Sequence, residues 1–290
     1  ALVMGMLGWF IARRGLFPLQ AIKQRAAAIT AKNLHSRLPS EAIPRELAEL
    51  TDTLNGMLSR LEASFQRLSD YSSDLAHELR TPVSNLLTQT QVTLSKARSA
   101  DEYRDLLASN AEEFERLSRM ISDMLFLAQA DNNQVIPNLE SVDLAEEVRG
   151  LLEYYEILAE EKRLHLSISG NGLVDGDRLM LRRAISNLLS NAIRHTPEDG
   201  SIAIRIHGSD QGLVGLTVEN SGPVIPPEHL ERLFNRFYRA DSARNRTTEG
   251  AGLGLAITRS ILRAHGGDVH VTSADQLTQF MLLMPAKSGE

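Results

Sequence analysis

The sequence predicts an α plus α/β fold, in which a long helical region is followed by an α/β sandwich. Apolar residues from Leu54 onward step by four and three positions, which is the 3.5-residue period of a coiled coil or helical bundle. A second apolar series repeats every seven residues from Leu107 to Ala128. After Asn133 the pattern changes to short strands and amphipathic helices, which is typical of an α/β sandwich with a mixed sheet.

The composition excludes several classes of protein. The 290 residues carry 31 Lys and Arg against 37 Asp and Glu, and 42% of them are hydrophobic, so the chain is neither a disordered tail nor a collagen. The chain has no cysteine, which excludes disulfide bonds, thiolate zinc sites and a cysteine nucleophile. We expect no nucleic acid among its partners, and no metal-sensing site within these residues.

Residues 1–12 are predicted to be the end of a transmembrane helix that begins before residue 1. The run is uncharged, and the aromatic pair Trp9 and Phe10 precedes Arg13 and Arg14, as at the cytoplasmic end of such a helix. The run is too short to cross a bilayer alone, since a spanning helix needs about 20 residues. The first 40 residues hold six basic and no acidic side chains, which favours this interpretation over a buried core helix.

Residues 67–133 are predicted to form an antiparallel hairpin of two long helices. The segment Lys96–Asp101 separates the two apolar series, and Ser99 or Asp101 is expected to cap the second helix. A single hairpin exposes half of its apolar seam. We therefore expect two copies of the chain to form a four-helix bundle, as a homodimer.

A histidine stands out within the first helix of this hairpin. His77 lies two residues from the seam positions Leu75 and Leu79, which turns its side chain by about 200° away from the seam and into solvent. Glu78 beside it is a carboxylate able to orient an imidazole and take its proton. Pro82 is expected to break or kink the helix about one turn later.

Residues 138–290 are predicted to form the sandwich, with its helices on one face of the sheet. Asp177 is expected to cap the second helix of this domain. The expected elements, in order, are a helix at 145–161, a strand at 164–169, a helix at 177–195, strands at 202–206 and 213–218, a helix at 253–265, and strands at 269–272 and 279–284.

Two asparagines in the helix at 177–195 suggest a polar site. Asn187 and Asn191 are four residues apart, so both side chains lie on one helix face. Amides on an otherwise apolar helix are costly unless they bond to something, and amide oxygens suit Mg²⁺ together with phosphate oxygens. Arg194, one turn further on, could neutralise phosphate charge. The alternative is a pair of capping or surface amides.

Glycines mark two further parts of this site. Asn220 and Gly222 follow a predicted strand, where a glycine allows close approach to the backbone. Gly250, Gly252 and Gly254 open the helix at 253–265, and would give an anion access to its N–H groups. The polar segment 241–248 before them is expected to be a lid.

Together these motifs resemble those of the sensor histidine kinases of two-component systems. The sequence H-E-L-R-T-P at His77 resembles the H box, N-L-L-S-N-A-I-R-H at Asn187 the N box, L-F-N-R-F-Y-R at Leu233 the F box, and G-A-G-L-G-L at Gly250 the second glycine box. Residues 13–66 resemble a HAMP linker, and V-E-N-x-G at Val218 is similar to the heavy-metal (copper/silver) subfamily. The resemblance implies a GHKL-type (Bergerat) ATP-binding domain at 138–290 and a cytoplasmic position at the inner membrane of a bacterium.

The resemblance also implies roles for individual residues. His77 would be phosphorylated from ATP, with Glu78 accepting its proton and Thr81 positioning water for the phosphatase reaction. Asn191 would ligate Mg²⁺ with Asn187 beside it, and Asn220 would bind adenine. Further nucleotide contacts would come from Arg194, His195, Gly222, Arg236, Arg239, Gly250, Gly252, Leu253 and Gly254. The phosphoryl group would pass to an aspartate in the receiver domain of a separate response regulator.

One motif departs from the family pattern and keeps two alternatives open. The family usually has D-x-G-x-G where this chain has Asn220, Gly222 and Val224. An Asn carbonyl can accept the same hydrogen bond without charge, whereas Val224 leaves the backbone less free than glycine. The alternatives are a GHKL-fold ATPase that drives a conformational clamp, and a dimerisation scaffold whose nucleotide site is inactive.

Overall fold

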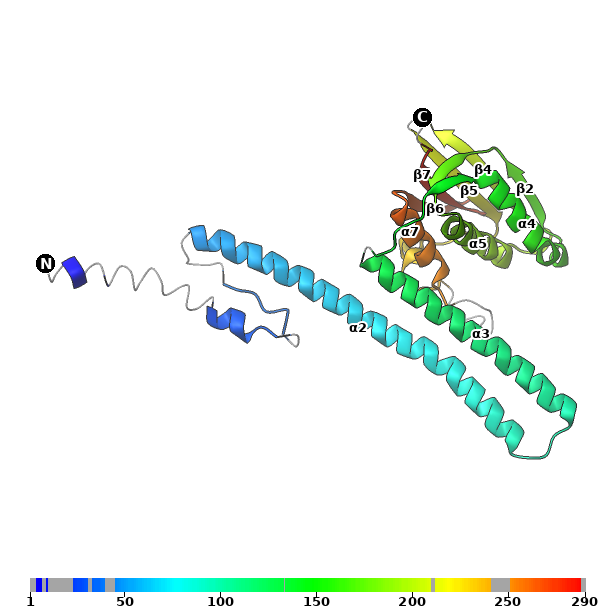
Figure 1. Cartoon of the computed structure of the whole chain (residues 1–290), viewed down its shortest axis with the longest axis horizontal. Coiled ribbons are helices and arrows are strands. Elements are labelled where there is room, and N and C mark those ends of the chain that lie inside the picture. Colours follow the sequence, from blue (N-terminus) through cyan, green and yellow to red (C-terminus); the bar gives the residue numbers. More distant parts are fainter. Residues whose placement is uncertain are drawn as a thin grey trace. The chain divides into compact units, whose positions relative to one another are not determined.

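The computed structural model describes residues 4–6, 9, 23–30, 33–39, 45–132, 134–209, 212–240 and 251–287 (Figure 1). The chain divides into two compact units, Ala1–Ser84 and Asn85–Glu290, and each is described by itself. The predicted end of a transmembrane helix at 1–12 lies largely outside the described residues. Within the described ranges, no helix combines the length and the apolar character that crossing a membrane requires.

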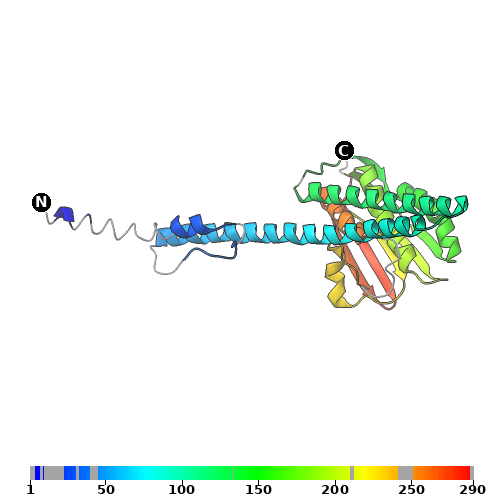
Figure 2. The same cartoon turned by 90° about the horizontal axis from the view of Figure 1, so that it is seen from below.

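The first unit is built on the amino-terminal part of helix α2 (Arg45–Leu94). An extended segment at residues 36–39 lies along this helix (Figure 2). The Leu38 N–H donates to Asn55 Oδ1 at 2.9 Å, and Asn55 Nδ2 donates to the Leu38 carbonyl at 3.1 Å. Arg37 and Glu62 form an ion pair at 2.6 Å. These contacts join the preceding segment to the helix.

Helix α2 continues without interruption through Pro82. Of the expected break or kink at this proline, the break is therefore wrong, and a kink stays a prediction. Proline removes a single N–H donor, and the helix retains its backbone bonding on both sides over a total of 50 residues.

Helix α3 (Ala100–Asp131) begins at a complete capping box. Ser99 Oγ accepts from the Glu102 N–H at 3.2 Å, and the Glu102 carboxylate accepts from the Ser99 N–H at 2.8 Å. Ser99, and not Asp101, is thus the cap. Near the connection the two helices run antiparallel, since Asn110 Nδ2 lies 3.5 Å from Thr90 Oγ1.

Helix α3 has two apolar faces, of which one is exposed and the other is buried. The seam residues Leu107 and Phe114 are 66% and 61% exposed. Met120, Met124 and Leu127 are buried. Helix α3 therefore buries one apolar face and exposes the other.

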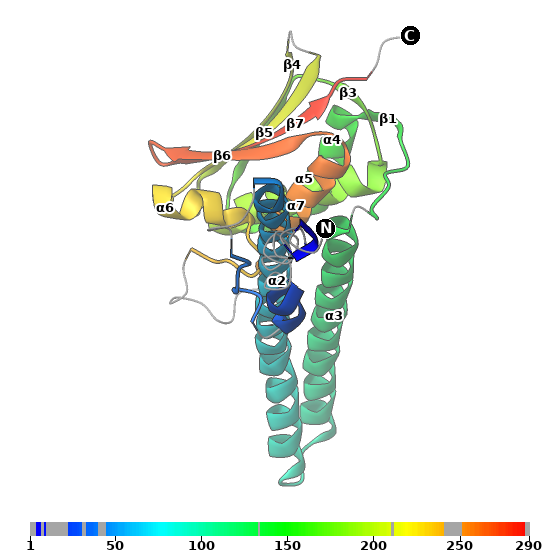
Figure 3. The ribbon, with the colours of Figure 1, turned by 90° about the vertical axis from the view of Figure 1, so that its left-hand side faces the viewer.

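The sandwich domain has a five-stranded sheet with helices on one face (Figure 3). The strand order is β2-β4-β5-β7-β6, with β2 and β4 parallel and the other neighbours antiparallel. The strands are β2 (His165–Ser169), β4 (Ser201–Ser209), β5 (Leu213–Ser221), β6 (Asp268–Ala274) and β7 (Leu277–Pro285). Helices α4 (Leu144–Glu161), α5 (Arg178–His195) and α7 (Gly254–Ala264) pack on β2, β5 and β6 respectively. The expected mixed sheet is confirmed.

Four short elements were not expected. Strand β1 (Glu140–Asp143) pairs antiparallel with β3 (Leu173–Gly176) as a separate two-stranded sheet. Helix α6 (Pro227–Leu230) and the 3₁₀ helix η1 (Glu231–Phe234) follow β5.

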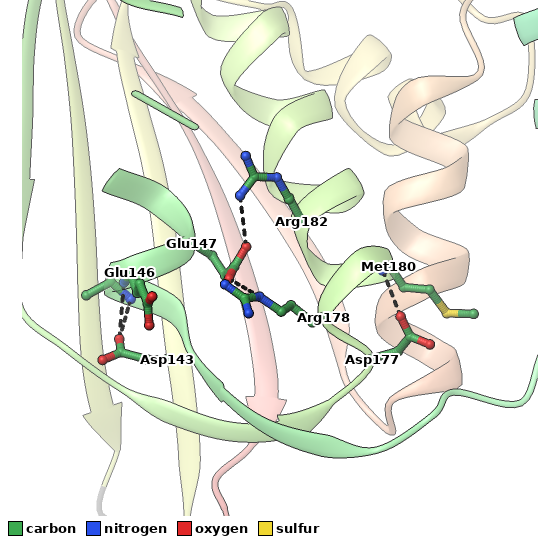
Figure 4. Close-up of polar contacts among 8 residues, drawn as sticks. Asp143, Glu146, Glu147, Asp177, Arg178, Met180 and Arg182 are labelled. Atoms are coloured by element: carbon green, nitrogen blue, oxygen red, sulfur yellow. Dashed lines mark hydrogen bonds and ion pairs between the residues drawn. The ribbon is translucent and has the colours of Figure 1, made fainter. Parts of the chain in front are cut away.

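Helix α5 is held in register by polar contacts at its start. Asp177 caps α5 as expected, accepting from the Met180 N–H at 3.0 Å (Figure 4). The Asp177 N–H in turn donates to Nε2 of buried His265 at 2.9 Å, which ties α5 to the end of α7. Glu147 of α4, only 2% exposed, bonds Arg178 at 2.5 Å and Arg182 at 3.2 Å (Figure 4). These contacts fix the helix that carries both predicted asparagines.

Candidate functional site

Asn187 joins α5 to the first turn of α7. Its Nδ2 donates to the Gly254 carbonyl at 3.0 Å and lies 3.5 Å from Thr258 Oγ1. Asn191 is half-buried one turn further along α5, and therefore lies on the same helix face. The structure thus brings Asn187 to the start of the glycine-rich helix, with Asn191 one turn away on the same face of α5.

The amino terminus of α7 is suited to bind an anion. The helix begins at Gly254, and its N-cap residue Leu253 is 1% exposed and makes no side-chain cap bond. The N–H groups of a first helical turn have no partner within the helix, and the helix dipole favours negative charge there. A phosphate group fits this environment.

Gly252 is required as glycine at this point for two reasons. Its φ is +69°, which L side chains rarely adopt, and a Cβ would lie 2.9 Å from the Phe237 carbonyl carbon. The Phe237 N–H donates to the Gly252 carbonyl at 3.0 Å. Gly250 and the expected lid at 241–248 lie outside the described residues.

The carboxyl end of α5 meets the turn after β5. A Cβ on Gly222 would lie 3.1 Å from the His195 carbonyl oxygen, and the Gly222 N–H donates to the Gln276 carbonyl at 2.8 Å. Asn220 is 4% exposed, and its Nδ2 donates to the Ser221 carbonyl at 3.2 Å. This bond orients the amide, so that Oδ1 is the atom left to accept a bond from a ligand.

Helix α5 therefore spans the site from one end to the other. Asn187 and His195 are eight residues apart, which is about 12 Å along a helix. Arg194 and His195 are exposed in its last turn, at the end that meets Gly222. An elongated ligand with a phosphate end at α7 and a base end at Asn220 matches this arrangement.

Lys162 supports this end of α5, and no motif in the sequence indicates this role. Its Nζ donates to the carbonyls of Ile193 at 2.9 Å and Arg194 at 3.0 Å. A cation at a helix carboxyl terminus satisfies carbonyls that have no partner within the helix. Lys162 thus fixes the backbone that carries Arg194 and His195.

The Arg236 guanidinium forms hydrogen bonds with residues of α3. It donates to Asp131 at 2.6 Å and to the Leu127 carbonyl at 3.4 Å. Arg183 of α5 also reaches α3, where it pairs with Asp123 and lies 4.9 Å from the centroid of the Phe126 ring. A phosphate contact by Arg236 stays a prediction, as does one by the exposed Arg239.

The predicted phospho-acceptor region lies on α2, in the first compact unit. His77 is exposed, as expected from its position relative to the seam, and Glu78 is half-exposed. Thr81 is exposed one turn later, with its hydroxyl 3.4 Å from the His77 carbonyl. His77 and Thr81 therefore share one helix face.

The residues at the site fit a magnesium–nucleotide complex better than a tightly held structural metal. Within the described ranges, no three His, Asp or Glu side chains are grouped to hold a metal ion. The available donors are the amide oxygens of Asn187 and Asn191. Mg²⁺ keeps several waters and takes phosphate oxygens, so a small number of protein oxygens is sufficient.

Three protein-family models match this chain. They are described as the HAMP domain, at residues 10–63; the His Kinase A (phospho-acceptor) domain, at residues 67–133; and the histidine kinase-, DNA gyrase B-, and HSP90-like ATPase, at residues 176–288. The asparagines, Asn220 and the glycine-rich helix all lie in the third match, and His77 lies in the second.

Several known proteins are similar over most of the chain. The sensor histidine kinase CusS of Escherichia coli K12 is 48% identical over 274 residues, which cover 94% of this chain and 57% of that protein. The probable sensor kinase SilS of Salmonella typhimurium is 45% identical, over 94% of this chain and 56% of that protein. The chain thus spans less than two thirds of these relatives. The solved structure of the Acinetobacter baumannii histidine kinase AdeS is 26% identical, with a TM-score of 0.61, over 72% of this chain and 98% of that one.

Proposed function

Because this chain belongs to the sensor histidine kinases, we propose that it phosphorylates His77 from ATP and passes the phosphoryl group to an aspartate of a response regulator. The observation that carries the proposal is the exposed His77 within the segment that matches a phospho-acceptor domain. An exposed imidazole can meet both a nucleotide and a partner protein.

The nucleotide is proposed to lie along α5. Asn220 Oδ1 accepts from the adenine amino group, and the uncapped start of α7 at Leu253 and Gly254 holds phosphate oxygens. Asn191, with Asn187 beside it, presents an amide oxygen to Mg²⁺. The bound Mg²⁺ supplies positive charge that offsets the negative charge of the phosphates. Arg194 and Arg239 add positive charge from protein side chains.

The chemical step is a displacement at phosphorus. A neutral nitrogen of His77 attacks the γ-phosphorus of ATP, a P–N bond forms, and the bond to the ADP oxygen breaks. Glu78 takes the proton that the imidazole nitrogen loses. In the transfer, a carboxylate oxygen of the regulator aspartate forms a bond to phosphorus and the P–N bond breaks. The proton held by Glu78 returns to the imidazole, which restores neutral His77.

A second reaction is proposed for Thr81. Its hydroxyl lies on the same helix face as His77, where it can position water against the phosphorylated aspartate of a regulator. The exposed seam that includes Leu107 and Phe114 is proposed to close a homodimeric four-helix bundle.

The chain is also proposed to face the cytoplasm at the inner membrane of a bacterium. The support is the apolar run at 1–12 followed by basic residues. The similarity to CusS and SilS supports the heavy-metal (copper/silver) subfamily as its class.

Incubation of the chain with γ-labelled ATP and Mg²⁺ tests the proposal. We expect a protein-bound label that is stable to alkali and lost in acid, and that is absent from His77→Gln. The Thr81→Ala chain is the matched control, because it should retain the label and lose only the phosphatase reaction. ATP hydrolysis without label would favour the clamp ATPase, and absence of ATP binding would favour the scaffold.

A further inference from the structure

We propose that Thr258 is a positioning residue for magnesium–nucleotide binding, and that it acts through Asn187. Thr258 is 0% exposed, in the second turn of α7. Its hydroxyl lies between α7 and α5, next to the side chain of Asn187. The inference rests on the proposed function for the identity of the ligand.

The hydroxyl of Thr258 donates its proton to backbone carbonyls. Oγ1 lies 3.0 Å from the Gly254 carbonyl and 3.4 Å from the Ala184 carbonyl, and both are acceptors. The remaining capacity of a hydroxyl is to accept a hydrogen bond. Thr258 therefore presents a lone pair, and not a proton, to Asn187.

Asn187 turns its amide nitrogen, which is a hydrogen-bond donor, toward α7. Nδ2 lies 3.0 Å from the Gly254 carbonyl and 3.5 Å from Thr258 Oγ1. A primary amide has two N–H donors, so two acceptors on α7 can engage both of them. The reverse orientation would place Oδ1 against two oxygens, which is repulsive.

This arrangement fixes which atom Asn187 offers to a ligand. With both N–H groups bonded to α7, Oδ1 is the atom left for the ligand side. Mg²⁺ takes oxygen ligands, or waters that an oxygen can hold, whereas an amide N–H would repel it. Thr258 thus selects the amide orientation that suits the metal–phosphate complex.

An ordinary structural role makes a different prediction. A helical Thr often bonds the carbonyl four residues earlier, as Thr258 does with Gly254. In that case, removal of the hydroxyl would change stability and leave magnesium-dependent binding unaltered. The two roles are therefore distinguished by ligand binding measured with and without the metal.

The test measures the dissociation constant of ADP by calorimetry, once with Mg²⁺ and once with a chelator. We expect Thr258→Val to weaken magnesium-dependent ADP binding by about five- to tenfold, the scale of one net hydrogen bond. Thr258→Ser, which retains the hydroxyl, should stay within about twofold of the original chain. Thr217→Val removes another buried hydroxyl, on β5, and should leave binding unchanged.

Three results would overturn the inference. They are unchanged binding by Thr258→Val, equal weakening with and without Mg²⁺, and failure of Thr258→Ser to restore binding. If Thr258→Val does not fold, hydrogen exchange of the Asn187 side-chain amide in the original chain decides. Slowed exchange is expected, and exchange at the rate of a free amide contradicts the proposal. Absence of ADP binding by the original chain contradicts the proposed function itself, and this inference with it.

Discussion

Phe237 and Gly252 are joined by a backbone hydrogen bond, with the Phe237 nitrogen 3.0 Å from the Gly252 carbonyl oxygen. Both residues have positive φ, +58° and +69°. They bring the end of the F box against the start of the glycine-rich helix. This contact places Leu253 and Gly254 at the site where phosphates are proposed to bind.

Gly252→Ala is expected to weaken ATP binding at least tenfold. The new Cβ would lie 2.9 Å from the Phe237 carbonyl carbon, so either the backbone of α7 or that of Phe237 must move. Positive φ adds about 1–2 kcal/mol of strain for a residue with a Cβ. ATP titration followed by calorimetry checks the loss.

Gly212→Ala is the matched control. Gly212 also has positive φ, +72°, but a Cβ there meets no described atom within 4 Å. We expect a lower melting temperature with unchanged ATP affinity. Loss of ATP binding in both variants would show that strain alone, and not the contact with Phe237, is responsible.

The second prediction concerns the base. The Ser221 carbonyl accepts from Asn220 Nδ2, which leaves Oδ1 to accept from the amino group of adenine. Guanine carries an oxygen at that position, so the chain should bind ATP in preference to GTP. Asn220→Ala should lose about tenfold in ATP affinity and most of this preference. Equal binding of the two nucleotides by the unaltered chain would contradict this assignment of Asn220.

Local rules predicted the Asp177 cap, and gave Ser99 as one of two candidates for the other cap. Ser99 and Asp177 each bond a backbone N–H three residues later, at 3.2 Å and 3.0 Å, and such spacing is visible in the sequence. The long amphipathic helices, and the places along the chain of the five strands of the main sheet, followed from periodicity in the same way.

Features that depend on distant partners were not predictable. Strands β1 and β3 have four residues each and lie about 30 positions apart, so neither has a readable pattern. Thr258 lies among Ile257 and Ile261 on a buried helix face, and the sequence alone places it in the core. Its role depends on Asn187, 71 residues away. The partner of Arg236 is on α3, more than 100 residues earlier, which no motif indicates.

The third prediction is a pH dependence at the contact between α3 and α5. Burial raises the pKa of Asp123, and Arg183 only partly opposes this effect. A carboxyl group with a raised pKa holds its proton more tightly in the folded state, so its contribution to stability falls as pH rises from its ordinary pKa through the raised value. Asp123→Asn should remove this pH-dependent contribution to stability.

Melting temperatures between about pH 4 and 7 check this sign. At pH 7 we expect Asp123→Asn to be as stable as the original chain or more stable, because it no longer desolvates a charge. Arg183→Ala should lower the free energy of unfolding by about 1–2 kcal/mol, since it leaves a partly buried carboxylate without its ion pair. If the melting temperature falls more steeply with rising pH in Asp123→Asn than in the original chain, the raised pKa of Asp123 is contradicted.

The last prediction concerns the two possible partners of Arg236. Its guanidinium bonds Asp131 at 2.6 Å, whereas the F box resemblance implies a phosphate contact. If a phosphate replaces the carboxylate when ATP binds, ATP must compete with Asp131. Asp131→Asn should then tighten ATP binding about two- to fivefold, because an exposed ion pair contributes about 0.2–1 kcal/mol. Arg236→Ala should weaken binding, and in the double variant Asp131→Asn should have no further effect. If Asp131→Asn leaves the ATP affinity unaltered while both single variants lower the melting temperature, Arg236 serves only to hold the catalytic domain on α3.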